Sequence, residues 1–399
     1  MKTIGKLSLF FLALVFLFSA CQKDEELTQI LEDESGLYTP DLKNGEVIEG
    51  QYIVVFKKEA LSSLKSATTY KAKKDLMKNE IESCLKTKNL DFIQNIYVES
   101  LYGFSGKLDD NQLSQLKNDD RVDYIEEDKL IMLGKPPWAG GGDDEDPTQE
   151  TPWGITRVNG GTATSDATAW IIDSGIDLDH PDLNVDVSRS VTYVPRSKNA
   201  NDENGHGSHV AGTIAAIDNN IGVIGVAPGA TVVAVRVLDR RGSGTYSAVI
   251  AGVDYVAANG SNGDVANMSL GGPVSNALDQ AVINAASNGI IFCLAAGNES
   301  DDANNHSPAR VNHNNVYTIS AMDINDNWAY FSNYGNPPVD YCAPGVSIKS
   351  CWKNGGYSTI DGTSMASPHA AGVLLLGAAH NGGTVNGDPD NNSDIIITH

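Results

Sequence analysis

The sequence predicts an α/β protein in which a parallel sheet is flanked by helices and preceded by a small α+β domain. Near-continuous apolar runs alternate with helical patterns in the C-terminal part of the chain: Ala169–Asp173, Val232–Leu238, Val265–Leu270, Ile290–Ala295 and Val316–Ser320. Such runs are typical of strands buried on both faces, which occur in parallel sheets covered by helices. Ahead of them, residues 47–133 predict the order β-α-β-β-α-β of a ferredoxin-like domain.

The elements of the small domain follow from its hydrophobic periodicity. Gln51–Phe56 predicts a strand, a Lys-rich helical stretch follows, and Asp110–Leu116 has helical spacing. Val122–Glu126 predicts the closing strand. This fold is common and has many uses, so it does not by itself indicate a function.

Changes in composition along the chain indicate two connecting segments, one on each side of the small domain. Residues 22–46 are polar and acidic and predict a flexible tether. Residues 134–148 contain a Pro-Pro pair, a glycine run and an acidic run, and they predict a linker that is open to a processing cut. The parallel-sheet domain then covers residues 149–399.

The N-terminal residues 1–21 predict export. Lys2 and Lys6 form a basic end, and the apolar run Leu7–Phe18 is too short for a comfortable transmembrane span. The run ends in Ser19-Ala20-Cys21, which resembles a bacterial lipobox, in which Cys21 becomes the lipidated first residue. A plain secretory signal is the alternative. We therefore expect an exported precursor, anchored at the bacterial cell envelope or surface by a lipid on Cys21.

The net charge argues against some classes of partner, and the cysteines argue against a disulfide scaffold and a zinc site. A formal net charge of -23 argues against a nucleic-acid backbone or an anionic membrane surface as partner, because like charges repel. Five cysteines are too few for a disulfide scaffold, and none lies in a CxxC or zinc-ligand spacing. Export permits a disulfide between Cys342 and Cys351, with two buried free thiols as the alternative.

Three segments supply the groups that serine-dependent peptide cleavage needs: a carboxylate, a base and a nucleophile. Asp173 ends an apolar strand, so its carboxylate is expected at the carboxyl edge of the sheet, where α/β sites are built. His206 lies in the glycine-rich motif Asn204–Thr213, which opens a helix. Ser364 lies in Asp361–Gly372, at the first turn of an apolar helix whose positive end lies behind the serine N–H.

These three motifs resemble the Asp, His and Ser motifs of the subtilisin (subtilase) family. The chain order Asp, His, Ser is that of subtilisin, whereas chymotrypsin-like enzymes and α/β-hydrolases use other orders. The resemblance extends from Gln149 to the 370s, and it implies a serine endopeptidase with these three residues as its catalytic triad. In front of such a domain, Tyr52–Phe56 and Arg121–Asp128 resemble the inhibitory propeptide of subtilisin-like proteases.

The resemblance also implies the remainder of the active site. Asn298 corresponds to the family's oxyanion asparagine, which acts together with the N–H of Ser364. Two segments are similar to the walls that bind substrate: Ser269, Leu270 and Gly271 on one side, and Ala295, Ala296 and Gly297 on the other. Binding of an extended peptide through main-chain hydrogen bonds predicts broad sequence tolerance.

We expect two further histidines to have structural rather than catalytic roles. His209 lies three residues after His206 and faces another side of the helix start, while His369 follows Pro368 inside a buried helix. The family motif His-Gly-x-His places the base at its first histidine, which is His206.

A structural calcium ion is implied by the same resemblance. Calcium takes six or more oxygen ligands, including backbone carbonyls, from a loop that wraps it. The matching ligands are the side chains of Gln149, Asp182 and Asn219 and the carbonyls of Ile217, Ile221 and Val223. The alternative is that Asp218-Asn219-Asn220 is merely a turn that interrupts a helix.

We therefore expect a latent serine endopeptidase that acts on protein or peptide substrates as a monomer, with its own propeptide as intramolecular inhibitor. Maturation within about residues 133–149 is expected to release the enzyme from its anchor. The alternatives are a catalytically silent surface-binding lipoprotein on the same scaffold, and a lipase or esterase, which the missing GxSxG elbow disfavours. The tail after Ser364 is short, so the terminal helices of the family are expected to be trimmed or replaced.

Overall fold

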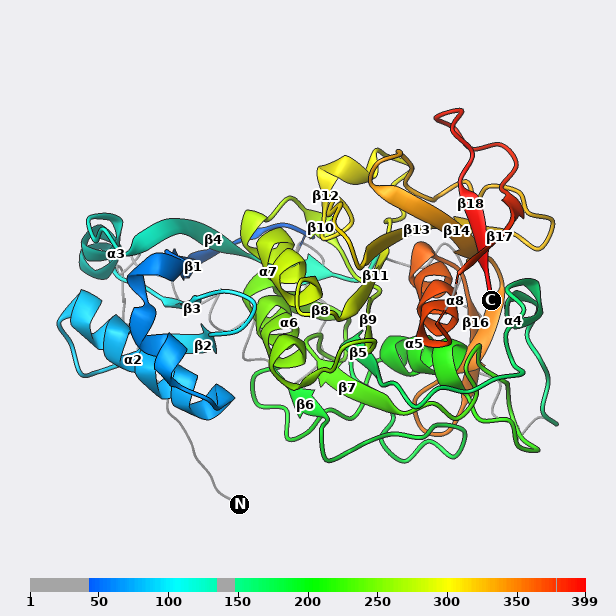
Figure 1. The fold of residues 1–399 in the computed structure, drawn as a ribbon, viewed down its shortest axis with the longest axis horizontal. Coiled ribbons are helices and arrows are strands. Elements are labelled where there is room, and N and C mark those ends of the chain that lie inside the picture. The colour runs from blue at the N-terminus through cyan, green and yellow to red at the C-terminus, as the bar shows by residue number, and fades with distance from the viewer. Residues whose placement is uncertain (1–42, 135–147, 378) are drawn as a thin grey trace, which may run out of the picture. The chain divides into compact units, whose positions relative to one another are not determined.

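The computed structural model describes residues 43–134, 148–377 and 379–399 (Figure 1). The predicted export signal with Cys21, most of the predicted tether and nearly all of the predicted linker lie outside the described residues. Among the described residues, no helix has the length and apolar character that a membrane span requires.

The small domain has the predicted order of elements. Its elements are β1 (Val47–Phe56), η1 (Lys58–Ala60), η2 (Ser62–Ser66), α2 (Tyr70–Leu85), β2 (Ile93–Tyr97), β3 (Gly103–Lys107), α3 (Asp110–Lys117) and β4 (Val122–Met132). The side chain of Thr69 caps α2, and Asp109 and Gln112 form a capping box at α3. The strands pair antiparallel in the order β2-β3-β1-β4. β4 continues past the predicted end at Glu126.

The extended end of β4 joins the two domains. It pairs antiparallel with β8 (Ser243–Thr245) of the large domain, with Ile131 opposite Gly244 and Met132 opposite Ser243. The next residue continues the ladder, because the Leu133 N–H donates to the Gly242 carbonyl at 2.9 Å. The sheet of the small domain therefore has a fifth strand that comes from the large domain.

The large domain is built on a nine-stranded sheet in the order β17-β18-β14-β13-β11-β9-β5-β7-β6. All pairs are parallel except β17 with β18. The strands are β5 (Ala169–Asp173), β6 (Val191–Thr192), β7 (Val232–Arg236), β9 (Val265–Met268), β11 (Ile291–Ala295), β13 (Val316–Met322), β14 (Val339–Pro344), β17 (His380–Thr384) and β18 (Ile395–Thr398). Every residue of β5 is buried, as the apolar run predicted.

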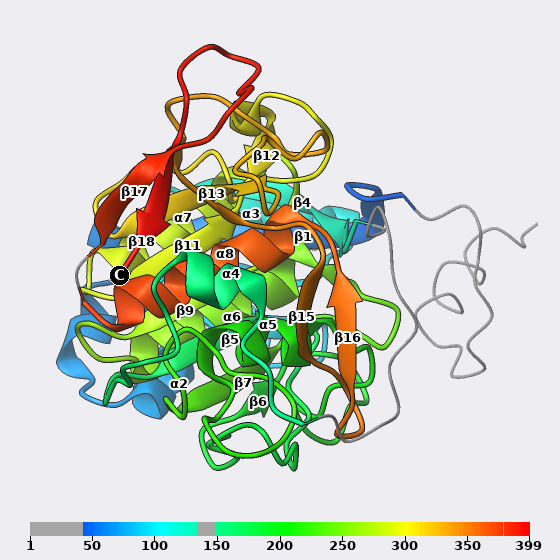
Figure 2. The same cartoon turned by 90° about the vertical axis from the view of Figure 1, so that its right-hand side faces the viewer.

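Helices cover both faces of this sheet (Figures 1 and 2). Ile171 of β5 packs in one core with residues of α5 and α8, whereas Trp170 and Ile172 pack in a second core with residues of α6 and α7. The helices are α4 (Trp153–Arg157), α5 (His206–Ala215), α6 (Tyr246–Asn259), α7 (Asn276–Ala286), η3 (Ala303–Asn305) and α8 (Thr363–Leu375). Two small antiparallel two-stranded sheets complete the domain, formed by β10 (Gly272–Pro273) with β12 (His306–Ser307), and by β15 (Ile348–Cys351) with β16 (Tyr357–Ile360).

The C-terminal tail forms strands rather than helices. β18 pairs in parallel with β14 at Cys342 and Ile396, and β17 folds back on β18. The tail therefore closes one edge of the central sheet, which agrees with the expected replacement of terminal helices. Cys84, Cys293, Cys342 and Cys351 are free and buried, so Cys342 and Cys351 follow the free-thiol alternative.

Candidate active site

Asp173 and His206 meet at the carboxyl edge of the central sheet. Asp173 is the last residue of β5, and His206 is the first residue of α5. The His206 Nδ1 lies 2.8 Å from Asp173 Oδ1 and 3.0 Å from Oδ2, and both side chains are buried. Burial opposes the charged form of His206, but the charge of Asp173, its hydrogen bond and the charge of Asp202 together outweigh burial and raise the histidine pKa above its ordinary value.

Glycines allow the close approach of these two segments. A Cβ at Gly207 would lie 2.0 Å from the Gly175 carbonyl oxygen, so no larger residue fits there. Asp202 fixes the turn into α5, because its carboxylate accepts from the N–H groups of Gly205 and Ser208 at 2.9 Å. The glycine-rich motif therefore holds His206 in a single position against Asp173.

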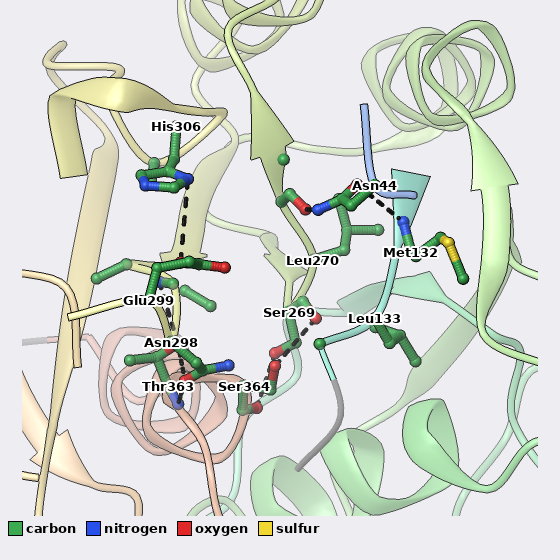
Figure 3. Close-up of a pocket in the computed structure, with 17 residues that line it drawn as sticks. Asn44, Met132, Leu133, Ser269, Leu270, Asn298, Glu299, His306, Thr363 and Ser364 are labelled. Atoms are coloured by element: carbon green, nitrogen blue, oxygen red, sulfur yellow. Dashed lines mark hydrogen bonds and ion pairs between the residues drawn. The ribbon is translucent and has the colours of Figure 1, made fainter. Parts of the chain in front are cut away.

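Ser364 lies in the first turn of α8, which packs against α5 in the same core. Its hydroxyl donates to the Ser269 carbonyl at 3.2 Å, and the Ser269 hydroxyl donates to the Ser364 carbonyl at 2.8 Å (Figure 3). These two bonds connect the predicted nucleophile to the predicted substrate-binding segment. The N–H of Ser364 belongs to the helix N-terminus, where the macrodipole favours negative charge.

Asn298 follows β11 and faces the same cleft. Its Oδ1 accepts from the N–H of Thr363 at 2.8 Å and from the Thr363 hydroxyl at 3.0 Å. Because the carbonyl end is occupied, the Nδ2 end is available as a donor. A Cβ at Gly134 would lie 3.8 Å from that Nδ2, so the end of the small domain reaches the predicted oxyanion donor.

The cleft is lined by residues of both domains (Figure 3). Ser364, Thr363 and Asn298 form its floor, and the walls include all six predicted substrate-binding residues: Ser269, Leu270, Gly271, Ala295, Ala296 and Gly297. The small domain contributes Asn44, Met132, Leu133 and Gly134. The end of β4 therefore lies where an extended substrate is expected.

Comparison with known proteins then identifies the family. A model of the subtilase family matches residues 156–393, which is more than half of the chain. The chain belongs to the subtilase family. A model of the peptidase inhibitor I9 family matches residues 51–133. The molecule is thus a serine-type endopeptidase with a subtilisin-like fold and an I9 propeptide domain ahead of it, as the sequence predicted.

Individual relatives agree with this assignment. Alkaline serine exoprotease A of Vibrio alginolyticus is 43% identical over 295 residues, which cover 71% of this chain and 53% of that protein. Subtilisin E of Bacillus subtilis is 39% identical over 339 residues, which cover 82% of this chain and 80% of that protein. Extracellular serine proteinase of a Thermus species is 37% identical over 357 residues, with 84% and 82% covered.

Two further histidines of this subtilase, His209 and His369, lie inside the core. His209 Nε2 lies 2.9 Å from the Ile348 carbonyl, and burial lowers the pKa of His209 to about 3. His369 Nδ1 lies 2.7 Å from the Met365 carbonyl, and burial lowers the pKa of His369 to about 4. Both rings are therefore neutral near pH 7 and bound to backbone, in line with the structural roles expected for them.

The predicted calcium ligands converge in one place. Asp182 is fully buried, and its oxygens accept from the Asn219 side chain at 2.8 Å and from the Val223 N–H at 3.1 Å. The Gln149 side chain donates to the Ile217 carbonyl at 2.8 Å. Burial raises the pKa of Asp182 despite these hydrogen bonds.

This group fits calcium by its chemistry. The hydrogen-bond donors to the buried Asp182 carboxylate are an amide, a peptide N–H and the Tyr357 hydroxyl, so a cation would stabilise it, and the neighbouring amide and carbonyl oxygens are ligands that calcium accepts. No cluster of three or more His, Cys, Asp or Glu that could hold a metal occurs in the part of the chain that the structure describes. Any ion here would therefore depend on amide and carbonyl oxygens.

Sequence reasoning missed several residues that line the cleft, among them Asn44, Glu299 and His306. Asn44 belongs to the predicted tether, and Glu299 and His306 belong to the far wall, where His306 Nδ1 lies 3.9 Å from Glu299 Oε2. His306 Nε2 also lies 3.3 Å from the Asp301 carboxylate. No local pattern marks these residues, because Asn44 and Glu299 lie in loops and His306 begins the two-residue strand β12.

Proposed function

We propose that this subtilase is an exported serine endopeptidase that is made as a self-inhibited precursor and cuts peptide bonds through an acyl-enzyme. The bidentate contact of Asp173 with His206 Nδ1 is the observation that carries the proposal. It leaves Nε2 as the ring nitrogen that can take a proton, which supports His206 as the base for Ser364 in the proposed triad. No comparable observation supports a silent scaffold or an esterase.

Each group has one role in the proposed reaction. His206 Nε2 takes the hydroxyl proton of Ser364, whose Oγ bonds to the peptide carbonyl carbon. Asn298 Nδ2 and the Ser364 N–H donate to the oxyanion. His206 then gives the proton to the leaving amine, and a water molecule deprotonated by His206 releases the acyl group. In the precursor the Ser364 hydroxyl points to Ser269, so it must turn toward Nε2 before attack.

Hydrogen bonds to two buried carboxylates support the proposal that the propeptide acts as the intramolecular inhibitor. Asp254 of α6 accepts hydrogen bonds from the propeptide, whose donors are the N–H groups of Val98, Glu99 and Ser100 and the hydroxyls of Ser100 and Tyr70. In the opposite direction, Asp128 of β4 accepts from the N–H and hydroxyl of Ser247 at the start of α6. Carboxylates at helix N-termini are favourable. The propeptide is therefore held over α6 while its last strand fills the cleft.

The contacts of β4 support a first cut after Gly134. Main-chain pairing fixes Met132 and Leu133 against Ser243 and Gly242, and Gly134 comes next, beside Asn298. Gly134 lines the same cleft as Ser364, so we propose the bond that follows it as the first to be cut. Mass spectrometry should show that the released propeptide ends at residue 134. A different C-terminal residue would contradict a first cut after Gly134.

The same contacts support broad sequence specificity. The ladder between β4 and β8 consists of main-chain hydrogen bonds, which any peptide without a poorly placed proline can form. Glycines on the enzyme side, such as Gly242 and Gly244, leave room for varied side chains. We therefore propose protein and peptide substrates of many sequences, with a monomeric enzyme.

We further propose that Gln149, Asp182 and Asn219, with the carbonyls of Ile217, Ile221 and Val223, bind a structural calcium ion. Calcium would stabilise the loop next to Asp182 without taking part in the reaction. We also propose that residues 1–21 direct export, because relatives such as the Thermus enzyme are named extracellular. A lipid on Cys21 would anchor the precursor, and the cut would free the mature enzyme because Cys21 lies on the propeptide side.

The test uses the full chain and its Ser364→Ala variant in a host without proteases. Wild type is expected to cut itself, to hydrolyse casein and to react with a fluorophosphonate, whereas the variant should do none of these. Labelling without peptide hydrolysis would indicate an esterase, and no labelling of a folded wild type would indicate a silent scaffold. Normal processing of the variant would overturn self-cleavage.

A further inference from the structure

The segment Lys43–Glu46 precedes the I9 match and forms a turn that is fixed to β4. The Gly45 N–H donates to the Leu130 carbonyl and the Leu130 N–H donates to the Glu46 carbonyl, both at 2.8 Å. The turn is closed by the Glu46 N–H, which donates to the Lys43 carbonyl at 3.0 Å. This part of the predicted tether is therefore an ordered edge on the strand that enters the cleft.

The Asn44 side chain connects that strand to the enzyme. Its Oδ1 accepts from the Met132 N–H at 3.1 Å, and its Nδ2 donates to the Gly271 carbonyl at 3.1 Å (Figure 3). An amide carries both an acceptor and donors, so one side chain can satisfy an N–H on one strand and a carbonyl on the next. On its other side, β4 pairs directly with β8.

The turn also fits closely against β10. Gly45 has a φ of 82°, and a Cβ at this position would lie 2.4 Å from Pro273 Cγ. A Cβ at Gly272 would lie 2.8 Å from Asn44 Oδ1. Gly45 therefore requires glycine, and a larger residue at position 272 would displace the Asn44 side chain, which indicates a packed contact.

We propose that Lys43–Glu46 is a second inhibitory segment, in which Asn44 fastens the propeptide strand to the substrate-binding carbonyl of Gly271. This inference rests on the proposed self-inhibited precursor. The segment occupies a main-chain acceptor that a substrate peptide would use. The contact persists after the cut, because Asn44 and Met132 lie on the same side of Gly134, so it slows release of the propeptide.

The experiment compares full-length wild type with Asn44→Ala, Asn44→Asp and the control Lys43→Ala. Asn44→Asp keeps an acceptor for the Met132 N–H but cannot donate to Gly271. Lys43 contributes main-chain atoms to the turn, so its truncation leaves both Asn44 bonds in place. Each protein is refolded, and the lag before hydrolysis of a chromogenic peptide is measured together with the gel band of the cut propeptide.

Both Asn44 variants are expected to shorten the lag and the lifetime of the bound propeptide by roughly five- to tenfold, because the lost bonds are partly exposed. Lys43→Ala should match wild type. Equal lags for Lys43→Ala and both Asn44 variants would overturn the inference. A wild-type lag for Asn44→Asp alone would also overturn the inference, because that variant lacks the donor to Gly271. If Asn44→Ala does not fold, the lag of Asn44→Asp is the result that tests the inference. A folded wild type without any hydrolysis would instead refute the proposed function.

Discussion

Replacement of Asp254 by alanine tests how the propeptide is held. The carboxylate accepts from five propeptide donors at 2.7–3.1 Å, and it is fully buried. A hydrogen bond to a charged acceptor contributes about 1.5–3 kcal/mol net. Even if water restores most of these bonds, the loss of two costs about 3–6 kcal/mol, which corresponds to a roughly 10²–10⁴-fold weaker hold.

The assay follows the cut propeptide and the activity of the full-length chain after refolding. Asp254→Ala is expected to lose co-elution of the cut propeptide with the large domain and to become active early, with unchanged kcat/KM once mature. Asp166→Ala, which removes an exposed carboxylate of the large domain, is the matched control. Co-elution and lag equal to those of the control would refute the reasoning, because the buried contact would then contribute nothing to inhibition.

Three further predictions concern the chemistry and the loop around Asp182. Asn298→Ala should lower kcat by roughly 10²–10³-fold with little change in KM, the range established for an oxyanion donor of subtilisin itself; a loss below about threefold would exclude this role. The base must be neutral to accept a proton, and the pKa of His206 is raised, so kcat/KM should fall with acid at a midpoint above 6.5. Asp173→Asn should lower both this midpoint and kcat/KM. An unchanged pH profile would exclude the Asp173–His206 contact as the cause of the raised histidine pKa. EDTA should speed thermal inactivation of wild type and leave Asp182→Asn unaffected, whereas equal inactivation of wild type with and without EDTA would exclude calcium.

Local patterns were sufficient to predict much of the fold. The strand Ala169–Asp173 was predicted with the bounds that β5 has, because its apolar run is followed directly by the polar sequence Asp173-Ser174-Gly175. The order of the small domain also followed from periodicity. The match was poorer for β4, whose continuation to Met132 depends on pairing with β8 rather than on its own residues.

The sequence by itself therefore determined the family and the three motifs, since each motif is contiguous and its chemistry is visible in a few neighbouring residues. Only the tertiary structure decided that the tail forms strands, that Cys342 and Cys351 stay apart as free thiols, and that Asn44 reaches the cleft. The Asn44 bond to Gly271 joins residues 227 positions apart, and no periodicity or motif records such a contact. Long-range packing decides which polar side chain meets which carbonyl, and that depends on the assembled fold.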